Sequence, residues 1–126
     1  MSTRELVVAV VDDDPRVLES LQELLQSAGH RVHLFEDARS FLEADAFGRV
    51  DCVVSDIGMP AIDGFELERL ARAARPGLPV ILITGRLELI KGQQTTARGE
   101  SRTFLLKPFS DQELLGAINK ALAPRT

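Results

Sequence analysis

The stretch Leu6–Pro15, LVVAVVDDDP, joins six apolar residues to three consecutive aspartates and a proline. A short apolar run that is rich in valine and ends in polar residues predicts a strand buried on both faces. Asp14 stands directly before Pro15, and an aspartate N-cap followed by proline is a favoured helix start. The stretch therefore predicts a strand, an acidic turn and a helix. Taken alone, the aspartates also fit a solvated loop and a helix cap.

The same alternation of strand and helix continues along the chain. Further apolar segments that resemble strands occur at Arg31–Phe35, Cys52–Ser55, Val80–Thr84 and Thr103–Leu106. Helical periodicity is found over Pro15–Gly29 and Ala38–Ala46, from Asp63 to just before Pro76, and after the capping-box sequence Ser110–Glu113. This alternation predicts an α/β domain with a central parallel sheet and helices on both faces. Residues 86–102 are polar and contain two glycines, so we expect a short, frayed or irregular helix there.

Composition limits the classes of function. The 126 residues fit a single domain spanning 1–126, and the net charge of −4 without a cluster of Lys and Arg argues against direct binding of nucleic acid. The apolar runs are too short to span a membrane, and the first residues lack the pattern of a secretion signal. A lone Cys52 agrees with a reducing compartment, so we expect a cytoplasmic location and no membrane partner.

Polar residues stand at the predicted strand ends. Asp12 and Asp13 follow the first strand, Asp56 ends the third in VVSDIGMP, Thr84 ends the fourth in ILITG, and Lys107 follows the fifth in FLLKPF. Ligands of such sheets bind beyond the carboxyl ends of the strands. Three converging carboxylates require a cation, and hard oxygen ligands suit Mg²⁺. The ammonium and hydroxyl groups would complement a phosphoryl group at the same place.

The order and spacing of these motifs resemble those of a known family. Together with Met59-Pro60, Asp63-Gly64, Thr84-Gly85 and Lys107-Pro108-Phe109, they resemble the receiver domain of bacterial two-component response regulators, and within it the FixJ type. The resemblance covers nearly the entire chain and is weakest over residues 86–102. It implies a flavodoxin-like (βα)5 fold, a doubly wound parallel sheet of five strands in the order 2-1-3-4-5.

The resemblance also implies a role for each acidic residue. Asp56 would accept a phosphoryl group from the phosphohistidine of a sensor histidine kinase or a phosphotransfer protein. Asp13, Asp56 and the main-chain carbonyl of Gly58 would bind Mg²⁺ directly, and Asp12 would act through a bound water.

Further implied roles concern the response to phosphorylation. Lys107 would pair with the phosphoryl oxygens, and a cis peptide before Pro108 would aim it into the site. The hydroxyl of Thr84 would swing toward the phosphoryl group, and Phe104 matches an aromatic switch position, although a plain core aromatic is the alternative. The face formed by residues 86–102, the fifth strand and the last helix would then change its interaction with an effector protein or a fused output domain.

Two other functions remain open from the sequence. A phosphohydrolase or phosphotransferase acting through an aspartyl phosphate would share the nucleophile and the metal, but the chain shows no substrate loop or cap domain, so we expect no turnover of an external substrate. A receiver-like interaction module that works without phosphorylation is the second alternative.

The remaining candidate residues have structural explanations. His30 and His33 flank the second strand and are expected at the surface, whereas Cys52 is expected in the core. Arg69, Arg72 and Arg75 recur at helical spacing, which is typical of a solvated face and less often of a docking surface.

Overall fold

The structure, a computed structural model, describes residues 5–44, 48–96, 99 and 101–122. Its five parallel strands are β1 (Val7–Val11), β2 (Arg31–Phe35), β3 (Cys52–Asp56), β4 (Val80–Thr84) and β5 (Thr103–Leu106). They form one sheet in the order β2-β1-β3-β4-β5. The predicted α/β class, the parallel sheet and its strand order are therefore confirmed.

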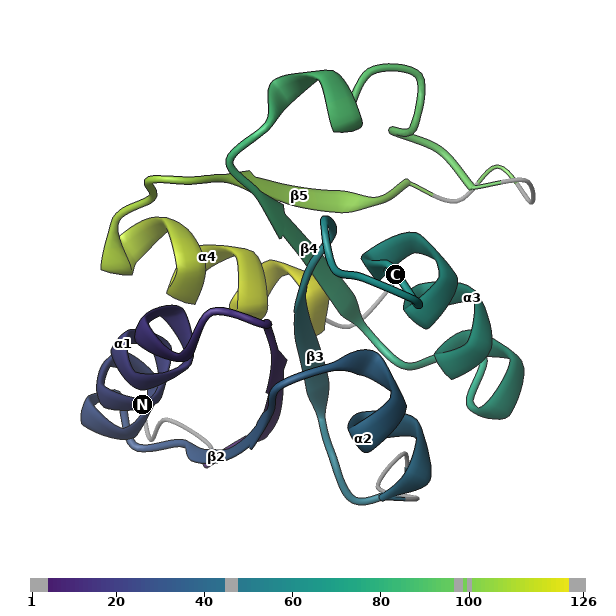
Figure 1. Ribbon diagram of the computed structural model, residues 1–126. Helices are drawn as coiled ribbons and strands as arrows, with labels where there is room; N and C mark the ends of the chain where they lie inside the picture. Colours follow the sequence, from purple (N-terminus) through teal and green to yellow (C-terminus); the bar gives the residue numbers. More distant parts are fainter. Residues whose placement is uncertain (1–4, 45–47, 97–98, 100, 123–126) are drawn as a thin grey trace.

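Four α-helices built from the described residues cover the sheet. They are α1 (Pro15–Ser27), α2 (Ala38–Glu43), α3 (Gly64–Ala74) and α4 (Asp111–Leu122). Helices α1 and α4 lie on one face and α2 and α3 on the other (Figure 1). Helix α2 ends at Glu43, earlier than predicted, and Ala46 lies outside the described residues. None of the helices built from the described residues has the length and apolar character needed to cross a membrane.

Each face of the sheet has its own hydrophobic core. Side chains alternate along a strand, so Val53 of β3 packs toward α2 and α3, whereas Cys52 and Val54 pack toward α1 and α4. All five residues of β3 and of β4 are buried because helices cover both faces. This explains why the central strands read as continuous apolar runs in the sequence.

Side-chain caps fix where the helices begin. Asp14 accepts a hydrogen bond from the Arg16 backbone N–H at 2.9 Å, which confirms it as the cap of α1. Asp63 accepts from the backbone N–H of Glu66 at 2.9 Å and caps α3 in the same way. Before α4, the backbone N–H of Ser110 donates to Glu113 at 2.9 Å and the backbone N–H of Glu113 donates to the Ser110 hydroxyl at 3.1 Å. The three helix starts were predictable for this reason.

The chain between β4 and β5 contains no α-helix in its described part. It forms a single turn of 3-10 helix, η1 (Leu87–Leu89), and an isolated bridge between Thr95 and Ser101. The prediction of a short or irregular element is confirmed, and the helix after β5 is consequently the fourth. In Figure 1 this segment forms an outer rim of the molecule beyond β5.

Candidate functional site

Three carboxylates meet at one edge of the sheet. Asp12 and Asp13 directly follow β1, Asp56 ends β3, and parallel pairing places Val11 beside Ser55 so that the strand ends coincide. Each aspartate contributes a carboxylate oxygen to a group in which these atoms lie within 4.8 Å of one another. Asp12 is 1% exposed and Asp56 8% exposed, whereas Asp13 is open to solvent. The predicted convergence of the three residues is confirmed.

Local backbone contacts hold this acidic group in place. The backbone N–H of Asp14 donates to Oδ1 of Asp12 at 2.9 Å, so the residue that caps α1 also orients the buried carboxylate. On the other side, Gly64 brings the first turn of α3 against the end of β3, and its N–H donates to the carbonyl of Ile57 at 2.9 Å. A Cβ at Gly64 would lie 2.6 Å from the carbonyl oxygen of Asp56, so this close approach requires glycine.

Lys107 supplies the positive charge of the site. Its Nζ donates to Oδ2 of Asp12 at 3.1 Å and to Oδ1 of Asp56 at 3.2 Å. The peptide bond between Lys107 and Pro108 is cis, as predicted. Burial alone would lower the pKa of Lys107, but the charges of Asp12 and Asp56 and the hydrogen bonds to them together outweigh burial and raise the pKa above its ordinary value of 10.5. The lysine is therefore a fixed cation between two buried acids.

The pKa of Asp12 reflects its burial beside other acids. Burial raises the pKa of Asp12 above its ordinary value, and the neighbouring charge of Asp56 acts in the same direction. The hydrogen bond from the Asp14 backbone and the charge of Lys107 oppose the shift without cancelling it. The arrangement is thus unfavourable for negative charge on Asp12 and suits an additional cation.

Thr84 lies on β4, next to the strand that carries Asp56, and Phe104 lies on β5, one strand further out. Thr84 is 2% exposed, and its hydroxyl oxygen accepts a hydrogen bond from the backbone N–H of Arg86 at 3.0 Å. Phe104 is partly buried and packs edge-on against Phe65 of α3, with ring centroids 6.2 Å apart. Gly58 lies in the exposed loop after Asp56, where a Cβ would sit 3.9 Å from Leu89 of η1. These positions suit the predicted roles, which stay predictions.

Two expectations about residues outside the site were wrong. His30 is 8% exposed rather than at the surface, because its Nδ1 accepts a hydrogen bond from the backbone N–H of Leu6 at 3.2 Å. The arginine stripe is not uniformly solvated either: Arg69 is exposed, but Arg72 is partly buried against Glu68 of the same helix. Cys52 in the core and His33 at the surface are confirmed.

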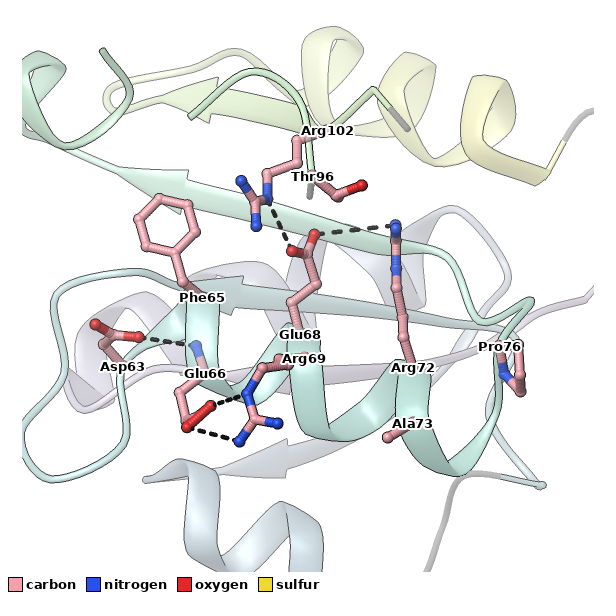
Figure 2. Close-up of a pocket in the computed structure, with 10 residues that line it drawn as sticks. All are labelled: Asp63, Phe65, Glu66, Glu68, Arg69, Arg72, Ala73, Pro76, Thr96 and Arg102. Carbon is pink, nitrogen blue, oxygen red and sulfur yellow. Dashed lines mark hydrogen bonds and ion pairs between the residues drawn. The ribbon is translucent and has the colours of Figure 1, made fainter. Parts of the chain in front are cut away.

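A second cluster of charges was missed by the sequence reading. A cavity of about 670 Å³ lies between α3 and the chain before β5, and Figure 2 shows the side chains that line it. Glu68 is buried there, and Arg102 donates to its carboxylate at 2.8 Å. The two residues are separated by 34 positions, and no motif or periodicity connects them. The one available signal in the sequence was Glu68 itself, an acidic residue directly beside Leu67 on the apolar stripe of α3.

Comparison with known proteins gives a consistent result. A family model described as the response regulator receiver domain matches residues 8–119. The chain is 38% identical over 115 residues to the transcriptional regulatory protein FixJ of Bradyrhizobium diazoefficiens, covering 91% of this chain and 56% of FixJ. It is 41% identical over 118 residues to the C4-dicarboxylate transport transcriptional regulatory protein DctD of Pseudomonas aeruginosa, covering 94% of this chain and 25% of DctD.

A solved structure agrees with these relatives. The response regulator receiver domain protein from Clostridium thermocellum superposes with a TM-score of 0.83 at 27% identity, covering 93% of this chain and 94% of that chain. The chain thus spans about half of FixJ, a quarter of DctD and nearly all of the receiver domain protein. The matching family model and relatives are consistent with the strand order and with the acidic cluster beside Lys107. The chain therefore belongs to the response regulator receiver domain family.

Proposed function

We propose that this receiver is a phosphorylation-dependent signalling domain in which Asp56 accepts the phosphoryl group. The observation that carries the proposal is the contact of the Lys107 ammonium with both Asp12 and Asp56, at 3.1 Å and 3.2 Å, beside a third carboxylate. An Oδ atom of Asp56 attacks the phosphorus of a phosphohistidine, the P–N bond breaks, the imidazole leaves, and an acyl phosphate remains on Asp56. This displacement depends on positioning and charge neutralisation more than on proton transfer.

The proposed metal is Mg²⁺, held by Asp13, Asp56 and the carbonyl of Gly58, with Asp12 acting through a water. The donor set supports this choice, because three carboxylates with oxygens within 4.8 Å of one another offer only hard ligands. When bound, the ion neutralises negative charge on the phosphoryl oxygens. Asp12 is buried and hydrogen-bonded to the Asp14 backbone, so it is suited to orient a water rather than to move.

Lys107 and Thr84 are the proposed partners of the phosphoryl oxygens. Lys107 releases part of its contact with Asp56 and pairs with one oxygen, which replaces one anionic partner by another. The Thr84 hydroxyl accepts from the Arg86 backbone, so its proton is free to be donated to a second oxygen once the side chain turns. The space that Thr84 leaves allows Phe104 to pack further inward, and the face formed by the β4–β5 chain, β5 and α4 changes with it.

The proposed partners follow from the family and from the length of the relatives. A sensor histidine kinase or a phosphotransfer protein in the cytoplasm delivers the phosphoryl group, and an effector protein or a fused output domain receives the signal. FixJ and DctD are named as transcriptional regulatory proteins and are longer than this chain, which supports an output domain elsewhere. We propose that residues 1–126 act as a single receiver unit that does not turn over an external substrate and does not itself bind nucleic acid or membrane.

The test is the labelling of Asp56 by a small phosphodonor. Wild-type protein incubated with acetyl phosphate and Mg²⁺ gains one alkali-labile phosphoryl group by mass spectrometry, and Asp56→Asn gains none. Asp111→Asn, an exposed aspartate in the first turn of α4, is the matched control and labels like the wild type. Undiminished labelling of Asp56→Asn would sink the assignment. An unlabelled wild type would favour the phosphorylation-independent interaction module, and sustained hydrolysis of phosphate esters would favour a phosphohydrolase.

A further inference from the structure

The described part of the chain between β4 and β5 is held by few hydrophobic contacts. We call residues 85–96, 99 and 101, the described part of this chain, the β4–β5 segment. None of these residues is buried, and its single helical turn, η1, has no side-chain cap. Leu89 packs against the core, but residues 91–95, 99 and 101 are exposed, so hydrophobic burial contributes little to the order of this later part. Polar contacts must fix its path.

Arg102, the residue before β5, supplies that interaction. Its backbone N–H donates to the carbonyl of Gln94 at 2.8 Å. Its Nη1 donates to the carbonyl of Gln93 at 3.0 Å, to Oε1 of Gln93 at 3.2 Å and to the carbonyl of Thr95 at 3.2 Å. The planar guanidinium presents several donors in one rigid fork. Three consecutive residues of the segment thus contact Arg102: Gln93 and Thr95 through its side chain, and Gln94 through its backbone.

Glu68 of α3 anchors this arginine to the body of the domain. Nε of Arg102 donates to Oε1 of Glu68 at 2.8 Å, and the side chains are 14% and 3% exposed. Figure 2 shows the Glu68 carboxylate between Arg102 and Arg72, the latter at 3.9 Å. A carboxylate buried this deeply must keep a cation beside it. The position of Arg102, and with it the β4–β5 segment, is therefore tied to α3.

The same guanidinium also reaches the proposed switch residue. The central carbon of the Arg102 guanidinium lies 5.0 Å from the centroid of the Phe65 ring, within the range of a cation–π contact. Phe65 in turn packs edge-on against Phe104 at 6.2 Å. A displacement of the Phe104 ring must therefore alter the surface on which Arg102 rests.

We propose that Glu68 and Arg102 form a latch that holds the β4–β5 segment against α3, and that repacking of Phe104 opens this latch through Phe65. The latch itself depends only on the contacts above, whereas its opening rests on the function proposed for Asp56 and Phe104. Closed, the latch holds the backbone carbonyls of Gln93 and Thr95 through the Arg102 side chain and covers one face of Phe65. Open, it frees the segment to adopt another conformation, so phosphorylation changes the order of this face as well as its charge.

The latch is tested by amide hydrogen exchange without Mg²⁺ or a phosphodonor. The reporters are the amides of Gln93 and Gly99, which donate to Ile90 and Thr96 within the segment. We expect Arg102→Met to accelerate the exchange of these amides at least about tenfold. Glu68→Gln should accelerate it about threefold or more, a smaller effect, because glutamine keeps an acceptor oxygen and loses only the charge. The double variant resembles Arg102→Met alone, because both substitutions break one interaction.

The control lies on the same helix. Glu66 forms an exposed ion pair with Arg69, so Glu66→Gln changes the charge of α3 equally and leaves exchange in the segment within about twofold of wild type. Unchanged exchange in both Glu68→Gln and Arg102→Met, or additive effects in the double variant, would reject the latch. Glu68→Gln keeps the test valid should Arg102→Met fail to fold.

The opening step is tested separately with beryllofluoride and Mg²⁺. In wild type this phosphoryl mimic raises exchange at Gln93 and Gly99, and in the double variant, whose latch is already open, it adds less than about twofold. If the mimic changes nothing while Asp56 still accepts a phosphoryl group from acetyl phosphate, the opening step is wrong and the proposed function stands. If Asp56 is not labelled, the proposed function and the opening step both fail. The exchange data without Mg²⁺ still show in that case whether Glu68 and Arg102 hold the segment.

Discussion

Replacement of Lys107 by methionine isolates the electrostatic role of this side chain. Methionine keeps most of the apolar stem and removes the ammonium that lies 3.1 Å from Asp12 and 3.2 Å from Asp56. At an effective dielectric constant of about 20, each contact is a gross attraction of about 5 kcal/mol, and in bulk water about 1 kcal/mol. The lysine side chain is 27% exposed, so its desolvation and solvent screening reduce the net value.

The net expectation is a loss of about 2–4 kcal/mol in the free energy of unfolding without divalent metal, slightly below the cost of breaking a fully buried pair. The sign agrees with the raised pKa of Lys107, because a lysine that holds its proton more tightly when folded stabilises the fold below its ordinary pKa of 10.5. This contribution is lost as the pH rises above 10.5 and through the folded-state pKa.

The assay is urea unfolding followed by circular dichroism, in EDTA and in excess Mg²⁺. Lys91→Met, at an exposed position of the β4–β5 segment, is the charge-matched control and changes stability by less than about 0.5 kcal/mol. Mg²⁺ should stabilise Lys107→Met more than wild type, because the variant leaves its carboxylates without a cation. A variant as stable as wild type in EDTA would refute the claim that Lys107 holds the acidic group together.

Three further outcomes are expected. Burial raises the pKa of Cys52 to about 12, so a disulfide reagent such as Ellman's should react with it only upon unfolding in urea, and rapid reaction of the native protein would contradict a closed core. Gly64→Ala should lower stability by about 1–3 kcal/mol in urea unfolding and weaken labelling of Asp56, because the added Cβ would lie 2.6 Å from the carbonyl oxygen of Asp56. The control is Gly116→Ala in α4, where an added Cβ meets nothing within 4 Å, and this variant should be as stable as wild type or more stable. Ser110→Ala should cost about 1 kcal/mol in thermal denaturation through loss of the capping box, with Asp56 labelling unchanged; an equal loss of labelling would show that the cap also supports the site.

The sequence predicted the sheet and the acidic group for one shared physical reason. Parallel strands bring their carboxyl ends to the same edge, so residues that end separate apolar runs, such as Asp12, Asp56 and Lys107, must converge once the strands are recognised. The helix starts followed equally from local capping chemistry, as at Asp14. These features depend on short stretches of chain and on a regular topology.

The contacts that the sequence did not predict depend on irregular, long-range geometry. His30 is buried where its ring accepts a hydrogen bond from the backbone of Leu6, just before β1, which no property of its own stretch encodes. Glu68 and Arg102 meet because the described part of the chain before β5 is irregular and passes around the arginine, and periodicity carries no information about such a path. The roles of Gly58 and Phe104 depend on states with a bound metal or phosphoryl group, so they stay predictions.

The charges of the site explain why three consecutive aspartates can follow a buried strand. Asp14 is removed from the acidic group by its pairing with Arg16 at the start of α1. The other two aspartates and Asp56 are balanced by one ammonium, which leaves the group two charges negative when all three acids are ionised. A divalent cation held by these carboxylates would restore neutrality, so that a phosphoryl group could approach without net repulsion. The excess of acid over base thus makes metal binding a precondition for the proposed phosphorylation, so labelling of Asp56 should fail in EDTA even though every side chain is in place.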